Sequence, residues 1–486
     1  MEKLFKNKFI LPILLTFATL LLLAANVRRI LYNCFHAIDF SIYQQAIYDI
    51  ATNGIHNPYL TVRNIKIFSD HFDPVLIFAS PFAALFSYHP ASLIVFEWLW
   101  YFALLIGIIW IKRKSSYDEI FFYLFMAIFC RAFLSGLNYP IHPTTWTIFS
   151  AFLIALSIKK NNAIAIILSS TFFCFFKEIF PASIIFLGAY YLFIKRWRLG
   201  IILLIVSCGV AYFDYILRPQ FFSGTYSYNE IVLGAKNQSL IDKIWQTFLS
   251  YNYLDTFKTY YPFIIPLALV WKYELKNNKN WLKHPSIPIF ICFIPLLGIH
   301  YLSGLLIFHR TTTLAAFLLC ALIFSNLYTN IKHSNKWLII CTLPFLLNTS
   351  GLYTKFFAAV FLNKSSSCTI TPDKNEATQK LLELRNTISK DKTILATGGV
   401  IPRFLTPNMK IYVAGIFSAP QENYGYILFE REGSGDVWPY SRKQIENYIP
   451  LCEKGSKILL KNYYYFLAEG PFTQECTNAI HSKAMP

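Results

Sequence analysis

Long apolar runs recur along most of this chain, and most of them approach the length that a helix needs to cross a bilayer, about 20 residues. Charged residues make up only 14% of the 486 residues, whereas soluble domains carry about 25%. The sequence therefore predicts a polytopic α-helical membrane protein with about eleven transmembrane helices. The predicted spans are 9–26, 91–111, 117–135, 144–158, 162–176, 180–194, 199–217, 258–271, 286–305, 311–328 and 337–362.

The formal net charge is +18, which in a soluble protein would suggest a nucleic-acid partner. Here Lys and Arg gather in short loops after alternate spans, as they do in the cytoplasmic loops of membrane proteins, so we expect no nucleic acid. Lys3, Lys6 and Lys8 predict a cytoplasmic N-terminus, and no signal-peptidase site follows the first span. The same alternation predicts an extracytoplasmic C-terminal region.

A first outer loop is expected over residues 27–90, because 27–73 is too polar to span. The segment 74–87 is apolar, but at about 1.5 Å per residue it is shorter than the bilayer core of roughly 30 Å. If it spanned, Lys112–Lys114 would lie outside. We therefore expect 74–87 to be a juxtamembrane helix on the outer side.

The composition becomes polar and mixed after residue 363, which separates a transmembrane module, 1–363, from a C-terminal α/β domain, 364–486. Apolar residues at helical spacing predict a helix over 376–388. Short apolar runs predict strands over 393–397, 410–413, 426–429 and 457–460. This domain should lie outside, where an oxidising compartment would let Cys452 pair with Cys476, with Cys368 as a third candidate.

The first outer loop carries an acidic residue early, Asp39. One interpretation is that Asp39 caps a helix over Phe40–Asn53, and the other is that its carboxylate takes part in catalysis or binds a metal ion. Gln44 and Gln45 on the same helix could bind sugar hydroxyls or form its solvated face. The sequence alone leaves both pairs of alternatives open.

A second polar group, Asp70–Pro74, follows in the same loop. Pro74 suits the first turn of a helix, with Asp73 as its cap. His71 at a junction of loop and helix could hold a phosphate or a metal ion. Carboxylates with an imidazole also resemble a divalent-ion site for Mg²⁺ or Mn²⁺, with Asp39 and Asp73 as candidate ligands.

Ionisable residues also occur at the predicted outer ends of later spans, where they are costly unless paired or facing water. Lys177 and Glu178 are adjacent, so they could neutralise each other, or Lys177 could face a lipid phosphate. Together these residues could bind a phosphate or pyrophosphate group beside a general base. The candidate substrate-binding residues are Gln44, Gln45, His142, Lys177, Glu178, Arg218, His309 and Arg310.

These residues resemble the motifs of a family of predicted membrane proteins called domain of unknown function 2079. That family in turn resembles the GT-C glycosyltransferases, which have many spans and a large first outer loop with juxtamembrane helices. The resemblance implies that Asp39 is the base or metal ligand, with His71 and Asp73 at a second catalytic position. The matching stretches are Asp39-Phe40, Gln44–Ala46, Gly54, Asp70–Pro74, Pro81, Leu85-Phe86, Asn138–Pro143, Lys177-Glu178, Ile394–Ala396 and Ile401–Leu405.

The resemblance implies an inverting glycosyltransferase of the bacterial cytoplasmic membrane. It would move a sugar from a polyprenyl-phosphate donor to a glycan, lipid or protein acceptor on the outer face. A transporter or flippase of a lipid-linked sugar is the first alternative, but it would need polar residues along its spans, and the spans carry few. A non-catalytic envelope assembly protein is the second alternative.

Overall fold

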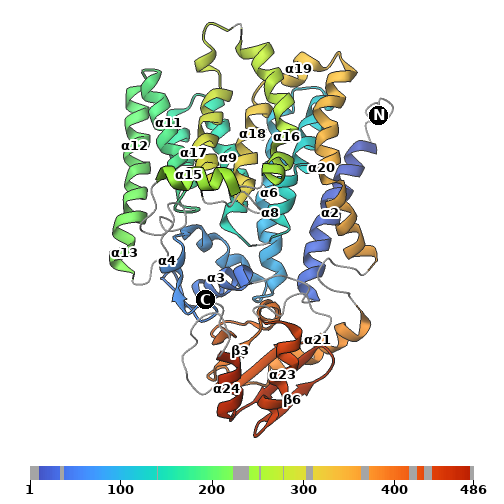
Figure 1. The fold of residues 1–486 in the computed structure, drawn as a ribbon. Helices are drawn as coiled ribbons and strands as arrows, with labels where there is room; N and C mark the ends of the chain where they lie inside the picture. Colours follow the sequence, from blue (N-terminus) through green and yellow to red (C-terminus); the bar gives the residue numbers. More distant parts are fainter. Residues whose placement is uncertain are drawn as a thin grey trace. The chain divides into compact units, whose positions relative to one another are not determined.

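The computed structural model describes residues 10–32, 38–139, 141–222, 240–250, 253–276, 278–302, 310–362, 371–414, 424–431 and 440–481. The chain divides into two compact units (Figure 1). The first consists of Met1–Leu20, Phe68–Val75 and Glu97–Leu352, and the second of Leu21–Ile67, Leu76–Phe96 and Tyr353–Pro486. This division cuts across the boundary that the composition predicts at residue 363.

Three long helices contribute residues to both units: α2 (Ile10–Leu31), α6 (Pro90–Lys112) and α20 (Asn335–Phe361). The rest of the first unit is also helical. Its elements are α7 (Tyr117–Ile128), α8 (Arg131–Leu137), α9 (Pro143–Lys159), α10 (Ala163–Cys174), α11 (Pro181–Phe193), α12 (Trp197–Tyr212), η2 (Phe213–Leu217), α13 (Arg218–Phe221), α15 (Leu240–Ser250), α16 (Tyr253–Val270), η3 (Trp271–Leu275), η4 (Trp281–Lys283), α17 (Ser286–Leu302), α18 (Arg310–Ile323) and α19 (Leu327–Ile331).

Among the described residues, three helices are long and apolar enough to cross a membrane: α6, the continuous run Trp197–Phe221, and α20. α7 and α8 would make a fourth span if they cross together. Five further helical segments are apolar but shorter: Pro74–Leu85, α10, α11, α17 and α18. The protein is therefore a helical membrane protein, and the count of eleven spans stays a prediction.

The span predicted over 117–135 is wrong as a single straight helix, because α7 and α8 meet at an angle of 52°. The reason lies in how α8 packs. The Thr312 hydroxyl of α18 donates a hydrogen bond to the Ala132 carbonyl of α8 at 3.2 Å. A Cβ atom at Gly136 would lie 2.3 Å from the Thr312 Oγ1 atom. The close approach therefore needs glycine, and it turns α8 away from the direction of α7.

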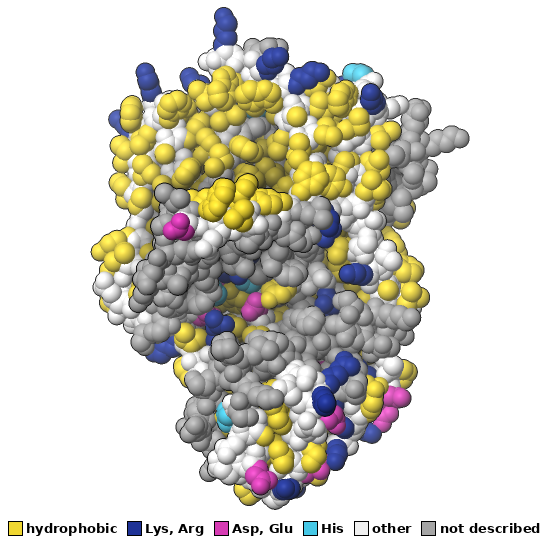
Figure 2. All heavy atoms as spheres, viewed as in Figure 1, with side chains coloured by type: hydrophobic (Ala, Val, Ile, Leu, Met, Phe, Trp, Pro, Cys, Tyr) yellow, Lys and Arg dark blue, Asp and Glu magenta, His cyan; other side chains and the backbone are white. Residues whose placement is uncertain are grey.

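The basic loops gather at one end of the first unit. Lys112–Lys114 after α6 and Lys159-Lys160 after α9 line one cavity of about 450 Å³. Lys159 also lines a second cavity with Arg196 and Lys283. Figure 2 shows Lys and Arg at the edge of a broad belt of hydrophobic side chains over these helices. The prediction that these loops share one side is confirmed.

The second unit contains most of the first loop. Its elements there are α3 (Ile38–Asn53), the paired strands β1 (Tyr59–Leu60) and β2 (Ile65–Lys66), and α5 (Ser80–Leu85). The 3₁₀ helix η1 (Pro74–Phe78) precedes α5, so the segment predicted as one helix over 74–87 forms two short helices. Leu85 and Phe86 are exposed, as an interfacial segment requires.

A mixed five-stranded sheet forms the rest of the second unit, in the order β4-β3-β5-β7-β6. β3 runs parallel to β4 and β5, whereas β7 runs antiparallel to β5 and β6. The four predicted strands are confirmed, and β7 is an addition. The elements are α21 (Pro372–Arg385), β3 (Ile394–Ala396), η5 (Gly398–Val400), α22 (Ile401–Phe404), β4 (Ile411–Val413), β5 (Tyr426–Glu430), α23 (Arg442–Glu453), β6 (Lys457–Lys461), β7 (Tyr465–Glu469) and α24 (Gln474–His481).

A disulfide joins Cys452 of α23 to Cys476 of α24, with Cα atoms 4.8 Å apart. The predicted pairing is confirmed, while the alternative candidate Cys368 lies outside the described residues. Both sulfur-bearing residues are buried beneath the sheet's apolar side chains. The disulfide therefore ties the two helices of this region to the same core.

Candidate functional site

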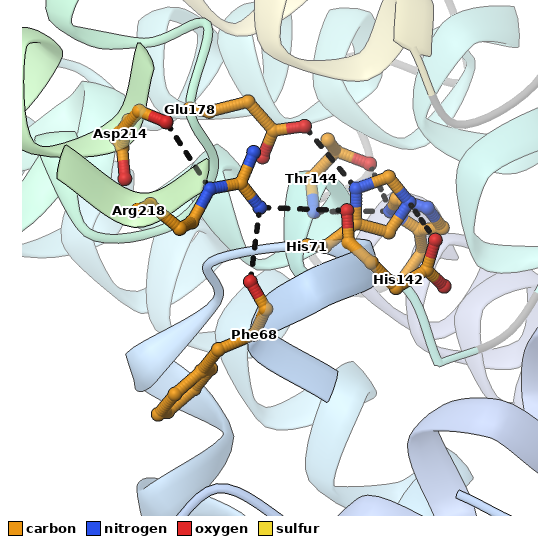
Figure 3. A network of polar contacts seen from close by, with 8 residues as sticks. Phe68, His71, His142, Thr144, Glu178, Asp214 and Arg218 are labelled. Carbon is orange, nitrogen blue, oxygen red and sulfur yellow. Dashed lines mark hydrogen bonds and ion pairs between the residues drawn. The ribbon is translucent and has the colours of Figure 1, made fainter. Parts of the chain in front are cut away.

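A buried acid–base pair lies in the first unit, between His71 and Glu178 (Figure 3). The Nδ1 atom of His71 lies 3.1 Å from the Glu178 Oε1 atom. A carboxylate only accepts hydrogen bonds, so Nδ1 carries the proton. Glu178 is 1% exposed in the turn between α10 and α11. Burial alone would raise its pKa, but the charge and hydrogen bond of His71 hold the pKa of this carboxyl below its usual range.

Arg218 fixes the segment that carries His71. Its Nη1 atom donates to the carbonyl oxygens of Phe68 at 3.3 Å and of Asp70 at 3.5 Å. Its Nε atom donates to the Asp214 carbonyl at 3.2 Å, and the side chain is only 3% exposed. The Nε and Nη1 atoms of Arg218 thus position this segment through backbone carbonyls, while its role in substrate binding stays a prediction.

Three further carboxylates are buried around this pair: Asp70, Asp73 and Asp214. The charges of Glu178 and Asp73 both act on Asp214, which is 1% exposed. Neither carboxylate oxygen of Asp214 has a hydrogen-bond donor among the described residues. The positive charges of Lys177 and Arg218 act on the same acids and offset part of their repulsion. The group therefore combines buried acids and bases within one unit.

A metal site is not built by the described residues. No three His, Cys, Asp or Glu side chains among them converge closely enough to hold an ion. The candidate ligands Asp39 and Asp73 belong to different units, so the structure gives no distance between them. A role for Mg²⁺ or Mn²⁺ stays a prediction.

Basic side chains form a second part of the same site. Lys177 and His300 are each 2% exposed, and the charges of Lys177 and Arg310 both act on His300. The Nη1 atom of Arg310, at the start of α18, is buried with no hydrogen-bond acceptor among the described residues. Three basic groups from three elements thus lie within electrostatic range, next to the turn that carries Glu178. His309, the remaining candidate, lies outside the described residues.

His142 is held by a buried glutamate. The carboxylate of Glu97 in α6 accepts hydrogen bonds from the backbone N–H groups of Ile141 at 3.0 Å and His142 at 3.2 Å. Ile141 has φ of 56°, an uncommon conformation for a β-branched residue. The His142 Nδ1 atom accepts from the Thr144 N–H group and caps α9. His142 is 4% exposed, and these contacts fix its place in the turn, while its role in substrate binding stays a prediction.

The residues predicted on α3 lie in the second unit. Asp39 is partly exposed and lies in the first turn of α3, which begins at Ile38. The predicted cap, with the helix starting at Phe40, is therefore wrong, although an acid in the first turn still suits the helix dipole. The carboxylate of Asp39 remains the candidate base in this unit.

The predicted solvated face is wrong for Gln44, whereas Gln45 on the same helix is partly exposed. Gln44 is fully buried and donates to the Pro402 carbonyl at 2.9 Å. Gln45 donates to the Thr61 Oγ1 atom at 2.7 Å and accepts from the Val62 N–H group at 3.0 Å. Both amides join α3 to neighbouring segments of the unit, so their contacts are structural.

Three buried ionisable residues were missed by the sequence reasoning: Glu97, Asp214 and His300. Each lies in a helix that reads as an apolar span, in the part of the helix away from its basic end. The signal was present, because an ionisable residue inside an apolar run marks a functional site by default. The expectation that the spans carry few polar residues is therefore wrong for these three helices.

No family model matches this chain, and no curated protein matches it. The resemblance to the domain of unknown function 2079 therefore stays a prediction. A solved structure does match over nearly the whole length.

That structure is the crystal structure of ArnT from Cupriavidus metallidurans bound to undecaprenyl phosphate. The two chains align with a TM-score of 0.51 at 10% sequence identity. The alignment covers 94% of this chain and 99% of ArnT. Identity this low shows the fold alone: this chain shares the fold of that membrane-lipid-bound structure.

Proposed function

We propose that the protein is an integral-membrane glycosyltransferase of the GT-C type. It moves a sugar from a polyprenyl-phosphate donor to an acceptor hydroxyl on the outer face of the membrane. A base removes the proton of the acceptor hydroxyl as its oxygen bonds to the anomeric carbon. The bond from that carbon to the phosphate oxygen breaks, and the polyprenyl phosphate leaves with the electron pair. A single displacement of this kind inverts the anomeric configuration.

The observation that carries the proposal is the likeness to ArnT along both chains. ArnT was crystallised with undecaprenyl phosphate, so a fold of this kind accommodates a polyprenyl phosphate. The buried charges of the first unit add independent support. They provide buried acids and basic groups that suit a phosphate, in a protein whose spans are otherwise apolar.

We assign the base to Asp39, following the resemblance of the first loop to GT-C proteins. Lys177 and Arg310 are assigned to the donor phosphate, because their cationic groups come from two elements and act on the same neighbour, His300. Arg218 and His142 support the site through the backbone. The contact between His71 and Glu178 joins the segment Phe68–Val75 to the turn that carries Lys177.

A flippase is the second candidate, and the buried residues Glu97, Asp214 and His300 favour it more than the sequence did. A transport path needs polar residues at several depths of the membrane. All three lie in the parts of their helices remote from the basic loops. Because all three residues lie toward the same ends of their helices, they fit a catalytic site at one face better than a transport path across the membrane.

We place the protein in a bacterial cytoplasmic membrane, with its basic loops inside and its α/β region outside. Basic loops favour the cytoplasmic side. The disulfide between Cys452 and Cys476 fits an oxidising outer compartment.

The test is transfer from a panel of radiolabelled polyprenyl-phosphate sugars in membranes that contain the wild type or Asp39→Asn. Asp49→Asn is the matched control, because Asp49 lies on the same helix α3 and pairs with His56 at the surface. We expect the wild type and the control to consume one donor and Asp39→Asn to lose that activity. If labelled lipid crosses the bilayer with its sugar still attached, the flippase function replaces this proposal.

A further inference from the structure

A cluster of basic side chains lies in the second unit, outside the site described above. It consists of Arg385 at the end of α21, Arg403 in α22, and His89 just before α6. The Arg403 Nη1 atom lies 3.2 Å from the His89 Nε2 atom. The Arg385 Nη1 atom donates to the Arg403 carbonyl at 3.0 Å. We call these three residues the cationic cluster.

The cationic cluster has no acidic partner in the part of the chain that the structure describes. The Nε atoms of both Arg385 and Arg403 are buried and have no hydrogen-bond acceptor there. Arg403 is only 7% exposed, so water cannot replace the missing acceptors freely. Arg431 in the same unit shows the usual arrangement, because Glu446 accepts two hydrogen bonds from it at 2.8 Å each.

The position of the His89 proton leads to the same conclusion. The Nδ1 atom of His89 accepts a hydrogen bond from the Ala91 N–H group at 3.2 Å. Nδ1 therefore has no proton in the neutral ring, and the proton is on Nε2. Nε2 then faces the guanidinium of Arg403, which only donates. Two donors point at each other, and they become compatible when an oxygen acceptor lies within reach of both.

The charges of the cluster also oppose one another. Burial, together with the positive charges of Arg403 and Arg385, lowers the pKa of His89. Burial and the neighbouring Arg385 likewise lower the pKa of Arg403. A bound anion would relieve this repulsion and satisfy the free N–H groups at once.

We propose that Arg385, Arg403 and His89 form a binding site for a phosphate group. A planar guanidinium donates two parallel hydrogen bonds to a phosphate, and two arginines with a histidine match its charge and its several acceptor oxygens. The phosphate comes either from a small soluble molecule or from a lipid headgroup. This site does not depend on the proposed transfer reaction, because none of its residues is assigned to that reaction.

The test is calorimetric titration of the full-length protein in a neutral detergent. One arm uses inorganic phosphate, and the other uses a short-chain phosphatidic acid. The variants are Arg403→Gln and Arg385→Gln, with Arg431→Gln as the matched control. We expect at least one ligand to bind the wild type and the control equally and to bind each cluster variant at least tenfold more weakly. Binding of phosphate identifies a small ligand, and binding of the phosphatidic acid alone identifies a lipid.

A second measurement separates loss of the site from loss of the fold. In phosphate-free buffer, Arg403→Gln should unfold at the same or a higher temperature than the wild type, because it removes an uncompensated buried charge. Adding the ligand should then raise the unfolding temperature of the wild type but not of the variant. Equal binding by the wild type and both cluster variants would overturn the proposal, as would the absence of binding in both arms.

Discussion

The two units each bury a group of charged side chains, but the groups are built in opposite ways. In the first unit, acids surround His71 and Arg218, and one of them, Glu178, pairs directly with the histidine. In the second unit, Arg385 and Arg403 lie together with no carboxylate beside them among the described residues. An acid-rich group can hold and release protons, whereas an uncompensated basic group can only be satisfied by an anion from outside.

This contrast indicates that the fold separates two tasks. In the first group, His71, Glu178 and Arg218 have partners within the protein, through contacts that also position the segment Phe68–Asp73. The second group is incomplete in the chain itself. Removing a residue from the first group should therefore harm the folded protein, while removing one from the second should mainly harm ligand binding.

The largest effect is expected for Glu178→Ala. This change removes the carboxylate that pairs with His71 and whose charge acts together with those of Lys177 and Arg218. Loss of one partner of a buried ion pair destabilises a protein by about 3–5 kcal/mol. Denaturant unfolding in detergent would measure it, with Glu453→Ala, a partly exposed acid that pairs with Lys461, as the control. If Glu178→Ala lowers the free energy of unfolding no more than the control does, the charged groups of the two units do not differ in the way described.

The disulfide provides the next largest effect, and it distinguishes the second unit from the first. The described cysteines of the first unit are free, whereas Cys452 and Cys476 are bonded across 24 residues of sequence. Replacing both by serine should lower the free energy of unfolding of this region by about 3 kcal/mol. Pulse proteolysis with and without reductant would measure the loss. If reductant leaves the wild type unchanged, the bond does not support this core.

A smaller effect is expected from pH at the cationic cluster. Because the pKa of His89 is lowered in the folded protein, the unfolded chain binds this proton more readily. Stability contributed by His89 is therefore present above the ordinary pKa of about 6.5 and is lost as the pH falls below it. A bound anion favours the protonated form of His89, because the histidine then adds a positive charge beside the anion. Sulfate keeps the same charge over this pH range. It should therefore bind roughly several-fold more tightly at pH 5.5 than at pH 7.5.

His89→Gln should remove that pH dependence. The matched control is His56→Gln, because His56 lies in the same unit, is exposed like His89 and already pairs with Asp49. Isothermal titration with sulfate at both pH values would measure the effect. An unchanged pH dependence in His89→Gln would separate His89 from the cluster.

Several parts of this structure could be predicted from the sequence because they depend on local pattern. Apolar runs predicted the helices, the basic loops predicted which helix ends lie together, and short apolar segments predicted β3, β4, β5 and β6. His71 and Glu178 could be chosen as candidates because ionisable residues at helix ends are conspicuous in an apolar chain. Their contact could not be predicted, because the two residues are 107 positions apart in the sequence.

Other features depend on tertiary contacts that no local pattern encodes. The break between α7 and α8 follows from the approach of Gly136 to Thr312 in α18. The burial of Gln44 follows from its bond to Pro402, 358 residues away. Arg403 was visible only as part of a motif. Its lack of an acidic neighbour is a property of the folded unit, so the cationic cluster could not be predicted.

The most direct test of the proposed function is the release of polyprenyl phosphate from a sugar-linked donor by the purified protein in nanodiscs. We expect the wild type and Asp49→Asn to release it in the presence of acceptor at similar rates. Asp39→Asn should be slower by about 10²–10⁴-fold, the usual contribution of a general base. Equal rates for Asp39→Asn and the wild type would contradict the assignment of the base. No release by the wild type with any donor, while the intact lipid crosses the bilayer, would contradict the transferase function itself.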